Sequence, residues 1–259
     1  MHQVTTIVPA YNESGRIGNV LAVLAEIPEL GEILLIDDGS TDATLEEMKR
    51  AAAVDSRIRV LQMPSNSGKG QAVLAAVALT HTRFVLMLDA DLMNLQKHHV
   101  LELIAPVTAG RADMTLGLFK GGHWSTDVSH WGAPWLTGQR CMRIELLRHL
   151  TAATASGYGL EIALTVAAQS HGYGVERVTL QGVWHPTSEF HRGRWKGLGW
   201  RKRMYREIWV AWKTVGGPAA LKSYVSRSLA QFWRDPLGAW PAAYERLTRL
   251  REKRREGNS

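Results

Sequence analysis

Short apolar runs alternate with segments of helical periodicity through the first half of the chain, and this alternation limits the possible folds more than any other feature. Runs rich in β-branched and large apolar residues, typical of buried strands, cover residues 4–8, 32–36, 58–61 and 84–88. Apolar residues three and four positions apart predict helices over residues 17–24, 45–52 and 69–79. Near-continuous apolar strands separated by helices are characteristic of a mainly parallel sheet with helices on both faces. We therefore expect an α/β fold.

The pattern continues less regularly in the second half of the domain. It predicts further helices near 96–107, 143–150 and 158–171, and further strands near 114–118 and 175–180. The stretch 121–138 is rich in Gly, Trp and small polar residues and has no clear period, so we expect a loop that covers a site. We also expect Thr41 or Asp42 to cap the helix over 45–52.

The charge of the chain is divided unevenly. Residues 190–259 hold 17 Lys and Arg against 5 Asp and Glu, whereas residues 1–189 hold 14 against 19. Six of the ten tryptophans also lie in the basic part. This shift predicts one domain over 1–189 and a basic, Trp-rich helical extension over 190–259. Basic residues interleaved with Trp favour anionic headgroups, so we expect a peripheral contact with the inner face of the cell membrane. The alternative is that these aromatic residues pack on the domain.

Composition excludes several other classes of protein. No apolar run approaches the roughly 18 residues of a spanning helix, so we expect the chain not to cross a membrane. The single cysteine, Cys141, excludes a disulfide framework and a four-thiolate zinc site, and we expect a cytoplasmic protein. No recognised nucleic-acid-binding motif accompanies the basic residues, so we expect no nucleic-acid partner.

Polar clusters follow three of the predicted strands. These are Pro9-Ala10-Tyr11-Asn12-Glu13, Asp37-Asp38-Gly39-Ser40 and Asp89-Ala90-Asp91. Ligands of open parallel sheets bind beyond the carboxyl ends of the strands, so all three clusters should face one crevice. Two aspartates one residue apart can direct oxygen ligands at Mg²⁺ or Mn²⁺, which completes its shell with water and phosphate oxygens. A nucleotide would be bound without the common phosphate loops, because no G-x-G-x-x-G is present and the surroundings of Lys69 do not form a Walker A loop.

The same clusters carry a family resemblance. Val8-Pro9-Ala10-Tyr11-Asn12-Glu13, Ile36-Asp37-Asp38-Gly39-Ser40-Thr41-Asp42, Asn66-Ser67-Gly68-Lys69-Gly70 and Asp89-Ala90-Asp91 resemble, in order and spacing, the motifs of family 2 glycosyltransferases with the GT-A fold. Within that family the chain is most similar to dolichol-phosphate and polyprenyl-phosphate sugar synthases and their bacterial relatives. The resemblance covers residues 3–95 best, extends to about residue 185 and does not include the basic extension.

The resemblance implies a role for each matching position. A UDP- or GDP-sugar would contact Pro9, Ala10, Tyr11, Glu13, Asp38, Lys69, Asp89 and Ala90. A Mg²⁺ or Mn²⁺ ion would be bound by Asp89, Asp91 and His185, with His191 as the competing histidine. Several of these residues have simpler explanations: Pro9 and Tyr11 could end a strand and pack, Lys69 could be solvated at a helix start, and Asp37 could brace its turn or touch the ligand.

Two catalytic candidates lie in the second half of the domain. Arg140, in a segment that resembles the acceptor or donor-phosphate side of the family site, could neutralise phosphate with its planar fork, or form a surface salt bridge. Glu161, expected in the first turn of a helix, could accept a proton from a hydroxyl acceptor, or simply favour the helix dipole. We therefore expect a metal-dependent, inverting glycosyltransferase that acts on a lipid acceptor, preferably polyprenyl phosphate. The alternatives are a glycolipid or diacylglycerol hydroxyl as acceptor, and a non-catalytic membrane-docked protein of the same fold.

Overall fold

The computed structural model describes residues 4–121, 137–152 and 159–186. Within these residues one sheet has the strand order β3-β2-β1-β4-β6-β5-β7. Its strands are β1 (Val4–Ala10), β2 (Leu30–Asp37), β3 (Ile58–Gln62), β4 (Phe84–Met87), β5 (Met114–Lys120), β6 (Arg140–Arg143) and β7 (Val175–Gln181). The helices are α1 (Ile17–Ala25), α2 (Thr44–Val54), α3 (Lys69–Leu79), α4 (Lys97–Thr108), α6 (Ile144–Arg148) and α7 (Gly159–Ser170).

The sheet is mixed but mostly parallel. β1 pairs in parallel with β2 and β4, β2 with β3, and β5 with β7. Strand β6 alone runs against its two neighbours, β4 and β5. The α/β fold with a single, mainly parallel sheet is therefore confirmed.

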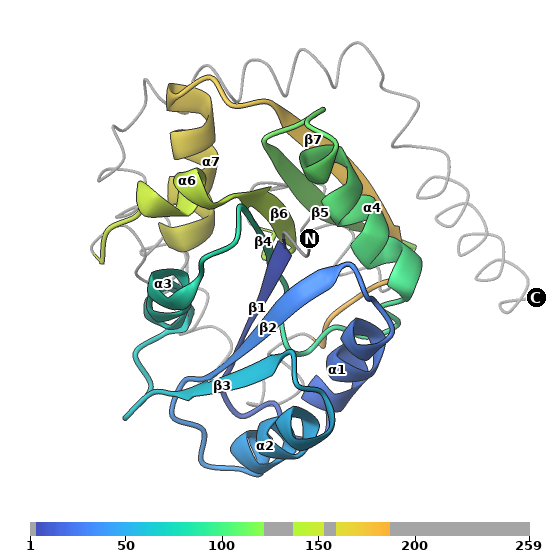
Figure 1. Ribbon diagram of the computed structural model, residues 1–259, viewed down its shortest axis with the longest axis vertical. Helices are drawn as coiled ribbons and strands as arrows, with labels where there is room; N and C mark the ends of the chain where they lie inside the picture. Colours follow the sequence, from blue (N-terminus) through green and yellow to red (C-terminus); the bar gives the residue numbers. More distant parts are fainter. Residues whose placement is uncertain (1–3, 122–136, 153–158, 187–259) are drawn as a thin grey trace, which may run out of the picture. The chain divides into compact units, whose positions relative to one another are not determined.

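Helices cover both faces of the sheet (Figure 1). Alternate residues of each central strand point to opposite faces, so the buried apolar side chains form two separate clusters. On one face Val8 and Leu35 pack with Ile17 of α1, Met48 of α2 and Leu103 of α4. The opposite cluster combines further residues of the same strands with residues of α3, α6 and α7, among them Ile7, Leu34, Val73, Leu146 and Leu160. The near-continuous apolar character of these strands follows from burial on both sides.

Pro9 lies inside β1, a central strand, although proline cannot donate to a strand ladder. The strand was expected over residues 4–8, and its end was wrong by two residues, since β1 continues through Pro9 to Ala10. The pairing of β1 with β4 ends at Ile7, and the amide of Leu88 donates to the Ile7 carbonyl just beyond it. Pro9 therefore pairs with Ile36 of β2 only. The ladder with β4 has already ended at Ile7, so it does not require an N–H from residue 9.

Two local predictions were wrong. Residues 140–143, which were expected to lie after the loop and to include the start of a helix at 143, form strand β6, and the following helix is confined to Ile144–Arg148. Helix α2 begins at Thr44 with Ala43 at its N-cap, so neither Thr41 nor Asp42 caps it. Asp42 instead accepts hydrogen bonds from the Thr44 amide, at 3.0 Å, and from the Ser14 amide, at 3.2 Å.

Several predictions fall outside the described residues. They are the basic extension over 190–259, His191, and most of the loop predicted over 121–138. The division at residue 189 likewise stays a prediction. Among the described helices, none combines the length and the apolar character that a bilayer span requires.

Candidate active site

The three polar clusters meet at one edge of the sheet. Strands β1, β2 and β4 are parallel neighbours, so their carboxyl ends point the same way. The chain moves outward from β1 to β2 and β3 and then returns to β4 on the other side of β1. Such a reversal of strand order opens a crevice beyond the strand ends, which is where ligands of this type of sheet bind.

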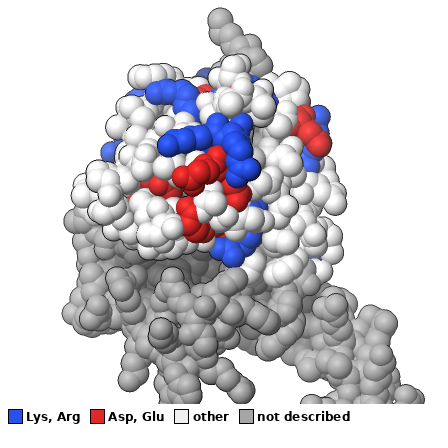
Figure 2. Space-filling model, turned by 90° about the horizontal axis from the view of Figure 1, so that it is seen from below, with Lys and Arg blue, Asp and Glu red and all other residues white. Residues whose placement is uncertain are grey.

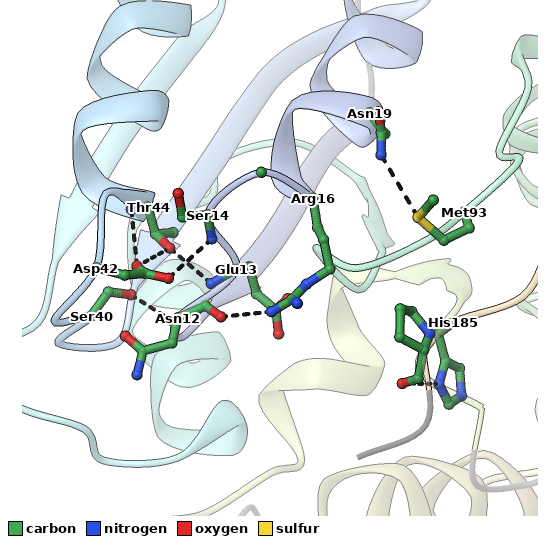
Figure 3. Close-up of polar contacts among 12 residues, drawn as sticks. Asn12, Glu13, Ser14, Arg16, Asn19, Ser40, Asp42, Thr44, Met93 and His185 are labelled. Atoms are coloured by element: carbon green, nitrogen blue, oxygen red, sulfur yellow. Dashed lines mark hydrogen bonds and ion pairs between the residues drawn. The ribbon is translucent and has the colours of Figure 1, made fainter. Parts of the chain in front are cut away.

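The first two clusters are joined by hydrogen bonds that involve Asn12 and Glu13 (Figure 3). The Asn12 amide donates to Ser40 Oγ at 3.0 Å, and Asn12 Oδ1 accepts from the Thr41 amide at 2.8 Å. Asn12 adopts a left-handed φ of 57°, which asparagine tolerates better than most residues. The Glu13 amide donates to Thr44 Oγ1 at 2.8 Å. The loops after β1 and β2 therefore form one connected rim.

Asp38 joins this rim to the loop before α3. Its Oδ1 accepts from the Ser67 amide and its Oδ2 from the Gly68 amide, both at 2.8 Å. The backbone approaches so closely here that a Cβ on Gly39, whose φ is 73°, would lie 2.7 Å from the Asn66 nitrogen. Asp38 thus fixes the loop that leads to Lys69, while its contact with a nucleotide base or ribose stays a prediction.

The neighbouring Asp37 braces its own turn. Its Oδ1 accepts a hydrogen bond from the Ser40 amide at 3.2 Å. Its buried Oδ2 has no hydrogen-bond partner among the described residues. The structure therefore gives Asp37 the bracing role that the sequence left open beside a ligand contact.

Lys69 connects two carboxylates from distant parts of the chain. Its Nζ lies 2.6 Å from Asp89 Oδ1 and 2.9 Å from Glu161 Oε1. Burial alone would lower the lysine pKa, but the charges of both carboxylates and their hydrogen bonds raise it above its ordinary value. For Asp89 burial alone would raise the pKa. The charge and hydrogen bond of Lys69 more than offset this effect and lower the pKa of Asp89 to about 2. Lys69 is therefore an ion-paired group of the site, and the alternative of a solvated lysine is wrong.

The residues Gly138 and Gln139, which the sequence did not single out, complete the surroundings of Asp89. Gln139 Nε2 donates to Asp89 Oδ2 at 2.8 Å, and Gln139 Oε1 accepts from the Asp89 amide at 3.0 Å. A Cβ on Gly138 would lie 2.5 Å from Lys69 Nζ and 2.6 Å from Asp89 Oδ2. The only sign in the sequence that Gly138 and Gln139 belong to the site is that they directly precede Arg140, which was a candidate.

The carboxylates of Asp91 and Glu13 lie close enough for the charge of Asp91 to raise the pKa of Glu13. Burial raises the pKa of Asp91, and the charge of Asp89 raises it further. Burial also raises the pKa of Glu13 to about 7, with a further contribution from Asp91. The Arg16 guanidinium, 2.6 Å from Glu13 Oε2, opposes this rise. The site therefore holds more negative charge than its own cations offset.

His185 is brought to these carboxylates by a short backbone bridge. Met93 and Trp184 exchange two backbone hydrogen bonds, of 2.8 and 3.2 Å, which hold the chain after β7 against the loop after β4. The charge of His185 lowers the pKa of both Asp89 and Asp91, so the ring lies within electrostatic reach of both. Figure 3 shows His185 at the right of the view, with the Glu13–Arg16 pair between it and Asp42.

These residues fit a divalent cation, although they do not form a complete shell. No group of three His, Cys, Asp or Glu side chains in residues 4–121, 137–152 and 159–186 is arranged as a metal-binding cluster. Among the same residues, no Lys or Arg forms an ion pair with Asp91. A carboxylate that is buried beside another acid, with a histidine nearby, suits a cation whose remaining ligands come from water or phosphate oxygens.

The remaining predicted residues divide between the crevice rim and the interior. Ala10 is buried at the end of β1 and Ala90 in the turn after β4, while Tyr11, next to Ala10 in the chain, is exposed. Glu161 lies in the first turn of α7, as predicted, and is buried against Lys69. Arg140 is completely buried in β6, where its Nε donates to the Thr137 carbonyl at 2.9 Å and its Nη1 to Thr165 Oγ1 at 3.1 Å.

Arg140 therefore lies in the interior and not at the surface, where the alternative to a phosphate contact had placed it. Its phosphate contact stays a prediction.

The face of the protein shown in Figure 2 mixes both signs of charge, because Asp and Glu side chains gather near its centre with Lys and Arg beside them.

Comparison with known proteins finds relatives that match part of this chain. A dodecaprenyl-phosphate galacturonate synthase of Rhizobium johnstonii is 26% identical over 145 residues, which are 53% of this chain and 43% of that protein. A dolichyl-phosphate β-glucosyltransferase of Trichomonas vaginalis is 43% identical over 96 residues, which are 34% of this chain and 28% of that protein. The chain thus matches less than half the length of these curated relatives.

Solved structures extend the likeness beyond these segments. Glucosyl-3-phosphoglycerate synthase of Mycobacterium tuberculosis, crystallised with Mn²⁺, UDP-glucose and phosphoglyceric acid, has a TM-score of 0.64 and 25% identity. The superposition covers 84% of this chain and 81% of that one. Crystals of the same enzyme hold UDP with Mn²⁺ or with Mg²⁺. Residues 5–159 match the family described as Glycosyl transferase family 2, and the chain belongs to that family.

Proposed function

We propose that this protein transfers a sugar from a nucleotide-sugar to an acceptor, with inversion at the anomeric carbon. The observation that carries the proposal is the cluster that Lys69, Asp89, Asp91, Glu161 and His185 form near the switch point of the sheet. This is the location at which open parallel sheets bind nucleotides. Family membership and the UDP complexes of a structural relative support the same donor class.

The charges of the site suit this reaction. Cleavage of the bond between sugar and diphosphate leaves negative charge on the departing nucleotide. A bound Mg²⁺ or Mn²⁺ ion would stabilise that charge, and Asp91, His185 and, in part, Asp89 would bind it. Lys69 forms an ion pair with Asp89 and so adds a cation beside it. Nucleotide contacts from Pro9, Ala10, Tyr11, Glu13, Asp38 and Ala90 belong to this proposal.

The acceptor decides whether Glu161 has a chemical role. A phosphate monoester, whose second pKa is ~6, is already a nucleophile near neutral pH, whereas a hydroxyl needs a base. Glu161 is buried and ion-paired to Lys69, so it is positioned to accept a proton only from an acceptor that enters beside Lys69. We propose polyprenyl phosphate as the first acceptor, because two relatives are named for dodecaprenyl or dolichyl phosphate. A soluble acceptor is the second candidate, because the structural relative was crystallised with phosphoglyceric acid.

The basic extension over 190–259 would bring the site to the inner face of the membrane. Co-sedimentation with vesicles that contain anionic lipid tests this part, and truncation after residue 189 should abolish the association. A chain that sediments equally with neutral and anionic vesicles would contradict the electrostatic contact.

The decisive experiment combines donor binding with product analysis. Thermal shifts with UDP- and GDP-sugars, each with Mn²⁺ or Mg²⁺, identify the donor, since a ligand that binds the native state raises the melting temperature. Transfer is then measured to polyprenyl phosphate, to a glycolipid or diacylglycerol, and to phosphoglyceric acid. Asp91→Asn should abolish transfer, while Glu29→Gln, at the opposite end of β2, should not. Donor binding without transfer to any acceptor would support the non-catalytic alternative.

A further inference from the structure

Gln139 contacts Asp89 at two points. Its Nε2 donates to the Asp89 carboxylate at 2.8 Å, and its Oε1 accepts from the Asp89 backbone amide at 3.0 Å. The two bonds use opposite ends of one amide group, so they fix both the turn after β4 and the orientation of the carboxylate that leaves it. Gln139 is 1% exposed, and water therefore does not replace these bonds readily.

The backbone of Gln139 is itself bonded to β5 and to Thr137. Its backbone amide donates to Thr137 Oγ1 at 3.2 Å, and its carbonyl accepts from the Gly117 amide at 2.8 Å. Thr137 Oγ1 also donates to the Gly117 carbonyl at 2.6 Å. A Cβ on Gly117 would lie 2.9 Å from Gln139 Cβ and 2.8 Å from Leu180 Cδ1. Glycine at position 117 therefore leaves the space that Gln139 occupies.

Lys69 cannot fix Asp89 in the same way. Its ammonium is shared between Asp89 and Glu161, and a Lys ammonium is a point charge on a flexible stem. A carboxylate held at one oxygen by such a group retains rotational freedom. The planar amide of Gln139 removes that freedom because it holds the second oxygen and the main chain together.

We propose that Gln139 is a positioning residue that orients the Asp89 carboxylate for the metal-bound diphosphate of the donor. The inference rests on the proposed function, since it assumes that Asp89 faces that ligand. In this role Gln139 acts on the donor through its two bonds to Asp89.

Two substitutions separate orientation from packing. Gln139→Met keeps the approximate length but forms neither bond. Gln139→Glu keeps an acceptor for the Asp89 amide and places a negative charge against Asp89 Oδ2. The matched controls are Gln169→Met and Gln169→Glu. Gln169 lies in the last turn of α7, whereas Glu161 lies in the first turn. The probe is the nucleoside diphosphate of the identified donor, titrated with Mn²⁺, and the steady-state kcat and KM are measured alongside.

We expect Gln139→Met to weaken diphosphate binding about tenfold, and Gln139→Glu to weaken it more, because a hydrogen bond to a charged group is lost and then replaced by repulsion. Both Gln169 variants should bind like the wild type. A crystal structure of Gln139→Met should show the Asp89 carboxylate rotated from its present orientation. The loss should affect the donor KM and kcat more than the acceptor KM, which a general loss of stability would not produce.

The proposal is overturned if both Gln139 variants bind the diphosphate with wild-type affinity, or if their losses match the Gln169 controls at equal melting temperature. A wild-type protein that binds no nucleotide with either metal would reject the proposed function itself. A wild type that binds, with Gln139 variants that bind equally well, rejects only the role of Gln139.

Discussion

Gly138→Ala tests whether the Lys69–Asp89 pair requires a position without a side chain beside it. The added Cβ would lie 2.5 Å from Lys69 Nζ and 2.6 and 2.7 Å from the two oxygens of Asp89, where ordinary contacts are 3.4 to 4 Å. Gly138 does not have a left-handed φ, so alanine suits its backbone and the whole effect comes from crowding. The pair must therefore move by nearly 1 Å. Lys69 can move at its flexible end, but Asp89 is held by Gln139.

The expected effect of Gly138→Ala is a loss of both stability and ligand binding. Overpacking of this kind costs about 1–3 kcal/mol of unfolding free energy, and each kcal/mol lowers the melting temperature by roughly 2–4 °C in a domain of this size. Donor diphosphate binding should fall as well, because the displaced carboxylate belongs to the proposed ligand shell. Thermal melts with and without the diphosphate and Mn²⁺ measure the two effects separately.

Two other glycines provide controls, one whose replacement should raise the stability of the protein and one whose replacement should lower it. Gly18 lies in α1 without a left-handed φ, and a Cβ added there would meet no atom within 4 Å, so Gly18→Ala should stabilise the protein by about 0.5–1 kcal/mol. Gly39 has a φ of 73° and a Cβ there would meet backbone at 2.7 Å, so Gly39→Ala should destabilise more than Gly138→Ala. If Gly138→Ala melts like the wild type and binds the diphosphate equally well, the reasoning about this pair is refuted.

Three further predictions follow from the buried ionisable groups. Lys69→Met leaves Asp89 and Glu161 without their shared cation and should abolish transfer and lower stability; Lys69→Arg should retain part of both, as activity assays and melts will show. Burial raises the pKa of the Cys141 thiol to about 12, so iodoacetamide should label it only after unfolding, as mass spectrometry can check. Burial lowers the pKa of His99 below its ordinary 6.5, so the unfolded state binds more protons just below that pH. Stability should therefore fall as the pH drops through 6.5 and below, and urea midpoints should show a smaller fall in His99→Gln.

The sheet and its crevice could be predicted from the sequence because both depend on local patterns. Apolar runs with helical segments between them specify a parallel sheet, and polar clusters at the strand ends then share one edge. Strand β6 could not be predicted in this way. It has only four residues, begins and ends with arginine, and becomes a strand because β4 and β5 offer ladders on both of its sides.

The partners within the site depended on contacts between distant residues. Lys69 could be placed at a helix start, but its two carboxylates lie 20 and 92 positions further along the chain. His185 could be suspected only by resemblance, because the bridge between Met93 and Trp184 that places it has no signature in the sequence. Gln139 was overlooked beside Arg140, since an arginine suggests phosphate binding more strongly than an amide does.

Asp38 shows why matching a residue to a family motif does not define all that it does. Both of its oxygens accept backbone hydrogen bonds from Ser67 and Gly68, so the carboxylate already maintains the loop before Lys69. Each carboxylate oxygen has a second lone pair, and a donor nucleotide could therefore share Asp38 with this loop. Removal of the carboxylate would then disturb Lys69 as well as the nucleotide. A loss of activity in an Asp38 variant consequently does not identify a ligand contact unless the Lys69–Asp89 pair is shown to be intact.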